Sequence, residues 1–239
     1  MAFSDRYLTI QKKFSHEVDQ LSFGEPVTHA YNPLDYARKP HSLWAKKYIL
    51  EPKKVVFLGM NPGPWGMTQT GIPFGEISLV RDWMGINCKV KHPTHEHPKR
   101  IVEGFECKRT EVSGQRLWSY FAERFPNAED FFKDHAVINY CPLVFMEESG
   151  RNRTPDKLKK EEREELFKIC DENLLKQLKL LKPDWLIGVG AFAQAKAKKV
   201  YGHEKVNIGT ILHPSPASPI ANRGWAEVAH RQLQEMGLA

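Results

Sequence analysis

The stretch that decides the fold is VVFLGMNPGPWGM, Val55–Met67. Its first four residues are apolar and rich in β-branched side chains, which predicts a strand buried on both faces, as in a parallel sheet. The strand must end at the Pro62-Gly63-Pro64 turn, because proline cannot donate to a sheet ladder and glycine adopts backbone angles closed to other residues. Asn61 is therefore expected at the carboxyl end of a buried strand, where ligands bind in open α/β sheets.

Further apolar runs predict three more strands, and helical spacing of apolar residues separates them. The expected strands cover 136–140, 185–189 and 206–212, and the expected helices cover 4–22, 77–86, 116–125, 154–181, 191–200 and 221–236. Strands that alternate with helices predict a parallel sheet between helical layers. We therefore expect an α/β fold of three layers, α/β/α, with a central four-stranded parallel sheet. Gly188-x-Gly190 is a weak nucleotide-binding signal, and close packing of a helix on a strand is the expected role of these glycines.

The length and the cysteine pattern indicate the class of protein. A chain of 239 residues is expected to form a single domain, 1–239, whose residues 1–50 are a helical part packing on the sheet. No apolar run approaches the roughly 18 residues of a membrane span, and the N-terminus has no apolar signal segment. The four cysteines lie far apart, which indicates reduced thiols and a cytoplasmic protein, or a nuclear one in a eukaryote. We expect a monomer with no membrane partner.

The net charge of +6 leaves two readings open. A basic protein can have no polyanionic partner, or its clustered cations can neutralise the phosphates of a nucleic acid. The clusters are Lys89 and Lys91, Lys99 and Arg100, Arg151 and Arg153, and Lys196, Lys198 and Lys199.

Polar side chains follow three of the expected strands, namely Asn61, Asn139 and His213. An amide cannot take up a proton at pH 7, so Asn61 is suited to orienting a water molecule or holding a substrate oxygen. The donor and acceptor of Asn139 match the edge of a nucleobase, and His213 can donate to an oxygen that gains negative charge. Phe74 lies in a Gly/Pro-rich loop, where it either caps the core or provides a stacking surface for a flat ligand. Taken singly, these residues also suit turns, caps and packing.

Several motifs resemble one enzyme family, the single-strand-selective monofunctional uracil-DNA glycosylases of the uracil-DNA glycosylase superfamily. The resemblance extends from about residue 55 to the C-terminus. The motifs are GMNPGPWGM (59–67), TGIPFGE (70–76), EHPKR (96–100), INYCPL (138–143), SGRN (149–152), HPSP (213–216) and ANRGW (221–225). The resemblance implies removal of uracil, and of oxidised 5-methyl derivatives such as 5-hydroxymethyluracil, from single- and double-stranded DNA by hydrolysis without strand cleavage.

The resemblance also implies roles for particular residues. Asn61 is expected to position the attacking water, and His213 to stabilise the departing base anion. Phe74 is expected to stack on the flipped uracil, and Asn139 to read its edge. Two rival readings remain open, a mismatch-directed thymine or uracil glycosylase and a catalytically idle nucleic-acid-binding module.

Other matched positions form the walls of the implied pocket and the DNA-contacting loop. Met60 and Gly63 match pocket-wall positions, and Gly63 is expected to leave room at the 5-carbon of the base. The DNA-binding residues implied by the resemblance are Pro214, Ser215, Pro216, Ala217 and Arg223. The family commonly continues HPSPRNP where this chain has HPSPASP, so Ala217 replaces an arginine. We expect a blunter wedge and weaker activity on duplex DNA than on single strands.

Residues 87–113 form a long polar segment rich in proline and histidine, of the kind that is functional or flexible. Potential metal ligands there are Cys88, His92, His95, His97 and Cys107. Their spacing fits no compact zinc pattern, and no cysteine lies near another as an iron–sulfur cluster requires. We expect no metal and no other cofactor.

Overall fold

Four parallel strands form the central sheet, in the order β3, β2, β6, β7. The computed structural model describes all residues, 1–239. The strands are β2 (Val55–Gly59), β3 (His135–Asn139), β6 (Trp185–Val189) and β7 (Asn207–Ile211). Every residue of β2 is buried, and β2 pairs in parallel with both β3 and β6. The predicted α/β fold with a four-stranded parallel sheet is confirmed.

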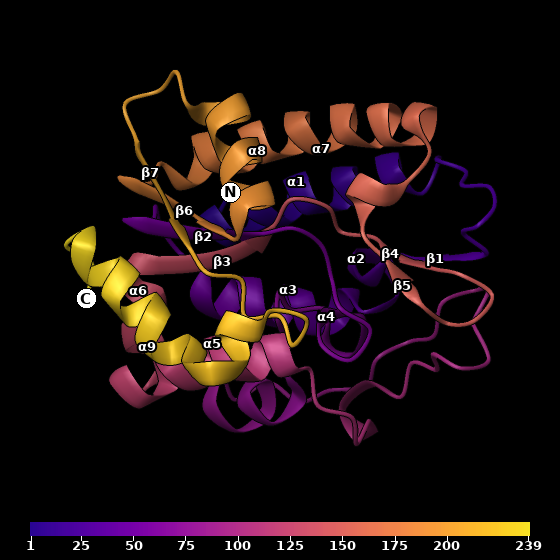
Figure 1. Cartoon of the computed structure of the whole chain (residues 1–239), viewed down its shortest axis with the longest axis horizontal. Helices are drawn as coiled ribbons and strands as arrows, with labels where there is room; N and C mark the ends of the chain where they lie inside the picture. The colour runs from indigo at the N-terminus through magenta and orange to yellow at the C-terminus, as the bar shows by residue number, and fades with distance from the viewer.

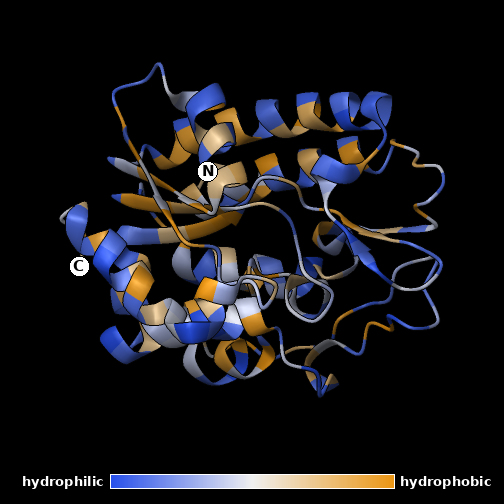
Figure 2. Ribbon diagram, in the orientation of Figure 1, coloured by the Kyte–Doolittle hydropathy of each residue, from blue (hydrophilic) through white to orange (hydrophobic).

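Helices cover both faces of this sheet (Figure 1). One layer contains α1 (Phe3–Val18), α7 (Lys160–Leu181) and α8 (Ala191–Tyr201). The other contains α3 (Arg38–Tyr48), α5 (Val112–Arg124), α6 (Ala128–Asp134) and α9 (Pro219–Glu235). Apolar segments concentrate on the strands and on the helix faces turned toward them (Figure 2). The N-terminal α1 packs against α7 and α3, and its Tyr7, Phe14 and Val18 belong to the core.

A second, smaller sheet was not predicted. It lies on the right in Figure 1, away from the central sheet and the C-terminus. It contains β1 (His29–Tyr31), β4 (Val144–Met146) and β5 (Asn152–Arg153), all antiparallel. Three helices were also missed, namely α2 (Pro33–Tyr36), α4 (Met67–Thr70) and α6 (Ala128–Asp134). These elements span only two to seven residues, too few for a clear periodic pattern, and β1 pairs with a strand more than 100 residues away.

Some predicted helix boundaries were wrong. The helix expected over 154–181 begins only at Lys160, because Pro155–Lys157 form a separate 3₁₀ turn and Leu158 is extended. Thr154 does not cap it with its side chain. The helix expected over 77–86 ends three residues early, at Trp83, and Leu79–Trp83 are π-helical. The helix expected from residue 116 begins four residues earlier, at Val112.

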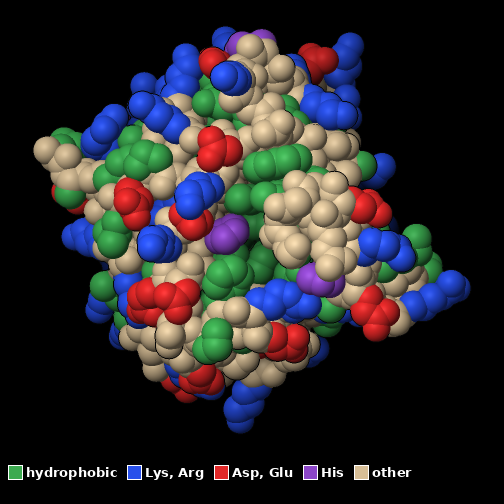
Figure 3. All heavy atoms as spheres, turned by 90° about the vertical axis from the view of Figure 1, so that its left-hand side faces the viewer, with side chains coloured by type: hydrophobic (Ala, Val, Ile, Leu, Met, Phe, Trp, Pro, Cys, Tyr) green, Lys and Arg blue, Asp and Glu red, His purple; other side chains and the backbone are tan.

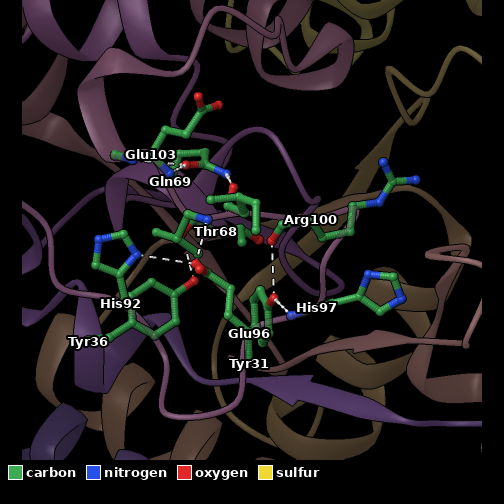
Figure 4. A network of polar contacts seen from close by, with 12 residues as sticks. Tyr31, Tyr36, Thr68, Gln69, His92, Glu96, His97, Arg100 and Glu103 are labelled. Carbon is green, nitrogen blue, oxygen red and sulfur yellow. Dashed lines mark hydrogen bonds and ion pairs between the residues drawn. The ribbon is translucent and has the colours of Figure 1, made fainter.

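The polar segment 87–113 is held in place by hydrogen bonds (Figure 4). The Tyr31 hydroxyl donates to the Arg100 carbonyl over 3.0 Å and accepts from the His97 N–H. The Gln69 amide oxygen accepts from the N–H groups of Glu103 and Gly104 at 2.8 and 3.0 Å. Hydrogen bonds therefore connect the segment to β1 and α4, so the segment is an integral part of the fold.

The histidines and cysteines of this segment have separate environments. The buried His97 accepts from the Lys99 N–H, and its other ring nitrogen lies 3.2 Å from the Glu148 carbonyl. Nowhere in the chain do three or more His, Cys, Asp or Glu side chains gather in a way that could hold a metal ion. All four cysteines are free thiols. No helix combines the length and apolar character needed to cross a membrane.

Candidate active site

A cavity of about 310 Å³ opens at the carboxyl ends of the central strands. The loops after β2, β3 and β7 all reach this edge of the sheet, because the strands are parallel. The cavity is lined by Met60, Asn61, Pro62, Gly63, Met67, Phe74, Glu111, Ser113, Asn139, Asn152, Thr154, His213 and Ser215. The structure thus brings together six residues predicted for catalysis or base binding, although they come from segments about 150 residues apart.

The amide of Asn61 has a defined orientation. Its Nδ2 donates to the carbonyl oxygens of Leu143 and Pro62, at 3.1 and 3.3 Å. Because both amide hydrogens have protein acceptors, Oδ1 is the atom left to receive a hydrogen bond. The geometry suits an acceptor that holds a water molecule.

Asn139 ends β3 and lies opposite Gly59 in the register of the sheet. Its Nδ2 contacts the Met67 sulfur at 3.3 Å, while its buried Oδ1 has no hydrogen-bond partner. A buried acceptor without a partner is costly, so this oxygen is suited to a ligand that brings an N–H.

Gly59 allows Asn139 and Phe74 to approach the backbone closely. A Cβ at this position would lie 2.4 Å from Asn139 Oδ1 and 2.5 Å from Phe74 Cε2. Phe74 itself has a positive φ of 53°, which is uncommon for a residue with a side chain. Such strain is found where the surrounding structure holds a functional group in place. The ring of Phe74 lies at the cavity wall, 6.1 Å from the ring of His213.

His213 follows β7 and lines the cavity with an uncharged ring at neutral pH. Burial lowers the pKa of His213 to about 4, and neither ring nitrogen bonds to another protein group. Gly190 lies against it at φ +93°, and a Cβ there would lie 3.1 Å from the His213 Cβ. A Cβ at Gly188 would lie 2.3 Å from the Gln194 nitrogen on α8, so the expected close packing of a helix on a strand is confirmed for Gly188, whereas Gly190 packs against His213.

The loop after His213 is held by Arg116, whose role the sequence did not reveal. The Arg116 guanidinium donates to the carbonyls of Pro214 and Ser215 and to the Asn222 side chain, at 3.1, 3.4 and 2.9 Å. Its partners lie about 100 residues away, so no local signal marks it. The predicted DNA-binding residues Pro216 and Ala217 are exposed at the tip of this loop, and Arg223 is exposed on α9.

Glu111 is a second cavity residue that the sequence reading missed. It precedes α5, and its carboxylate lies where a side chain of residue 63 would be, with Oε2 only 2.3 Å from an ideal Cβ on Gly63. A side chain at residue 63 would therefore meet this carboxylate, and Gly63 and Glu111 together form one part of the cavity wall. An acidic residue just before a helical pattern is a helix-start signal, but its reach to Gly63 depends on the tertiary fold.

Several members of the basic clusters noted in the sequence form ion pairs with carboxylates. Lys196 and Lys199 pair with Asp171, and Arg153 pairs with Glu147. Lys and Arg side chains on the face shown in Figure 3 are mixed with Asp and Glu.

Two arginines near the cavity have no carboxylate partner. The guanidinium carbons of Arg100 and Arg109 lie 5.0 and 5.2 Å from the Trp65 ring centre, in the loop that also carries Asn61. Because neither charge is neutralised by an ion pair, both remain suited to phosphate groups.

Comparisons with known proteins show which family the chain resembles over most of its length. A family model described as the uracil DNA glycosylase superfamily matches residues 47–232. The single-strand selective monofunctional uracil-DNA glycosylase of Rattus norvegicus is 46% identical over 239 residues, which covers 99% of this chain and 86% of the relative. The corresponding proteins of Mus musculus and Bos taurus are 45% and 44% identical, with 99% of this chain and 86% and 88% of the relatives covered.

A solved structure shares the fold at lower identity. The crystal structure of wild-type SMUG2 of Pedobacter heparinus aligns with a TM-score of 0.71 and 20% identity, covering 99% of this chain and 97% of that one. By its extent of identity to the curated relatives, the chain belongs to the single-strand-selective monofunctional uracil-DNA glycosylases of the uracil DNA glycosylase superfamily.

Proposed function

We propose that this protein is a monofunctional DNA glycosylase that hydrolyses the N-glycosidic bond of uracil in DNA and so initiates base-excision repair. The observation that carries the proposal is the convergence of Asn61, Phe74, Asn139 and His213 on one cavity. A binding module without activity needs none of these groups at the strand ends. The names of the curated relatives support the same reaction.

Recognition begins when the base leaves the DNA stack, because its glycosidic bond is unreachable inside a duplex. Asn139 Oδ1 accepts from uracil N3–H while the amide Nδ2 donates to O4, and the lack of any protein partner for this buried Oδ1 supports that assignment. Cytosine reverses both groups, so it would leave the Asn139 amide mismatched. A buried site built on such polar matching can reject the wrong partner by roughly 10⁴–10⁵.

Cleavage of the C1′–N1 bond places positive charge on the sugar and negative charge on the base. A neutral His213 that donates to uracil O2 stabilises this charge more in the transition state than in the ground state. Asn61 holds the water that then adds to the sugar carbon. No lysine lines the cavity, so no amine is placed to form a Schiff base with the sugar. This supports hydrolysis without strand cleavage.

The range of DNA substrates depends on the loop that follows His213. We propose activity on both single- and double-stranded DNA with a preference for single strands. The names of the relatives state single-strand selectivity, and the exposed Ala217 offers neither charge nor bulk to hold a duplex open. We further propose action as a monomer, supported by a cavity that one chain completes, and location in the cytoplasm, or in the nucleus of a eukaryote.

The test uses an end-labelled oligonucleotide with one uracil, single-stranded or paired with guanine, incubated in EDTA with and without later alkali. Strand breakage only after alkali is expected. Breakage without alkali would show a lyase step, and release of thymine from a T·G pair in preference to uracil would establish the mismatch-directed alternative.

The matched variants are Asn61→Ala and Asn87→Ala. Asn87 is an exposed asparagine outside the cavity lining. We expect Asn61→Ala to slow base release at least 100-fold with DNA binding retained, and Asn87→Ala to behave as wild type. Near-normal turnover by Asn61→Ala would remove Asn61 from the mechanism.

A further inference from the structure

The carboxylate of Glu111 is part of the cavity wall that the reaction described above does not use. A Cβ built on Gly63 would lie 2.3 Å from Glu111 Oε2 and 3.1 Å from Oε1. The acid side chain therefore occupies the space that a side chain at residue 63 would take. Both residues line the same cavity as Asn61 and Asn139.

This carboxylate has no cationic partner. It accepts from the Trp65 N–H at 3.3 Å and from the Ser113 N–H, and it takes part in no ion pair. Burial raises the pKa of Glu111, and the two backbone donors counter part of that shift. Burying a carboxylate without a cation is unfavourable, so such a group inside a binding cavity marks a functional position.

The remaining groups of the cavity determine which edge of the base meets Glu111. His213 is assigned to O2, and Asn139 to N3 and O4. The 5-carbon lies next to the O4 carbon on the ring, and the resemblance to the family implies that Gly63 lies beside it. A substituent on the 5-carbon would thus point toward the Glu111 oxygens.

Resting on the proposed function, we propose that Glu111 is a specificity residue whose carboxylate accepts a hydrogen bond from the hydroxyl of an oxidised 5-substituent, such as 5-hydroxymethyl. The same oxygens disfavour the 5-methyl group of thymine. A methyl group would exclude water from the carboxylate without supplying a donor, whereas a hydroxyl supplies one. Glu111 thereby favours the oxidised derivative over the normal base of DNA.

The test compares excision of uracil, 5-hydroxymethyluracil and thymine from otherwise identical single strands under single-turnover conditions. The variants are Glu111→Gln, which is isosteric, Glu111→Ala, and Glu106→Gln as the matched control. Glu106 is exposed and lies outside the cavity lining. Each result is the ratio of two rates from one protein preparation, so a loss of folded protein cancels.

We expect Glu111→Gln to lower the ratio of 5-hydroxymethyluracil to uracil about tenfold, because a hydrogen bond from the hydroxyl to a neutral amide is roughly half as strong as one to an ionised carboxylate. Glu111→Ala should lower this ratio similarly and raise the ratio of thymine to uracil. Glu106→Gln should leave both ratios unchanged. Equal proportional losses on all bases would show that Glu111 only holds the Trp65 loop, and would overturn the proposal. If wild type releases no uracil, the proposed function fails instead.

Discussion

The uncharged state of His213 makes the pH dependence of catalysis predictable. With a pKa of about 4, roughly one ring in a thousand is protonated at pH 7 and roughly one in thirty at pH 5.5. If the neutral ring donates to uracil O2, its active form is nearly fully populated over this whole range. If the imidazolium were the active donor, the rate would rise about 300-fold from pH 8 to pH 5.5, in proportion to the protonated fraction.

The assay is single-turnover release of uracil from a single-stranded oligonucleotide between pH 8 and 5.5, with wild type and His213→Ala. The variant should be slower by about 10²–10³, the usual value of one preorganised donor to a developing anion. Dividing the wild-type rate by the variant rate at each pH removes the contribution of other titrating groups. We expect this quotient to be flat.

Either of two results would refute the reasoning. A quotient that climbs by about tenfold per pH unit toward acid would show that the imidazolium is the active form. A quotient that bends near pH 6.5 would show that His213 keeps the ordinary pKa of an exposed histidine, so that burial in this cavity does not exclude its charge.

Three further predictions follow from other parts of the structure. Gly59→Ala should lower single-turnover uracil release at least 100-fold, because its Cβ would lie 2.5 Å from Phe74 Cε2; a rate within tenfold of wild type would contradict this. Ala217→Arg should raise the rate on duplex DNA relative to the rate on single strands. It should also make the duplex rate more sensitive to salt, by about the amount that one additional phosphate contact contributes. An unchanged ratio of the two rates would count against a role of this loop in holding the duplex. His41 and His213 both have a pKa lowered to about 4 by burial, so the unfolded chain takes up protons from pH 6.5 downward while the folded chain does not. The free energy of unfolding should be greatest above pH 6.5 and fall toward pH 4, by about 2 kcal/mol for each ring at pH 5. Urea denaturation at pH 7 and 5 measures this, and equal stability at both would disprove it.

Local sequence determined the parts of this protein that depend on near neighbours. The apolar runs at 55–58 and 136–140 predicted buried strands because every side chain of such a strand must be apolar. Proline and glycine after Asn61 marked where the strand must end. Since parallel strands all end at one edge of a sheet, the sequence also predicted that Asn61, Asn139 and His213 would meet. The motifs that resemble the family added the role expected for each.

The tertiary structure alone decided what depends on distant partners. Pairing of β1 with β4 joins residues more than 100 positions apart, and the hydrogen bond from Arg116 to the Pro214 carbonyl joins residues 98 positions apart. Helix boundaries near Thr154 were wrong because a buried Leu158 and a 3₁₀ turn overrode the local capping signal.

The chemistry of the cavity was decided in the same way. The lowered pKa of His213 and the raised pKa of Glu111 come from burial. The unpaired Asn139 oxygen is defined by what surrounds it. Sequence spacing specifies which residues are present and where each strand ends, whereas burial and long-range contact depend on the whole folded chain. For that reason the sequence indicated that Asn61 and His213 would share one edge of the sheet, with the roles that the family resemblance implies, but only the fold placed a carboxylate beside Gly63.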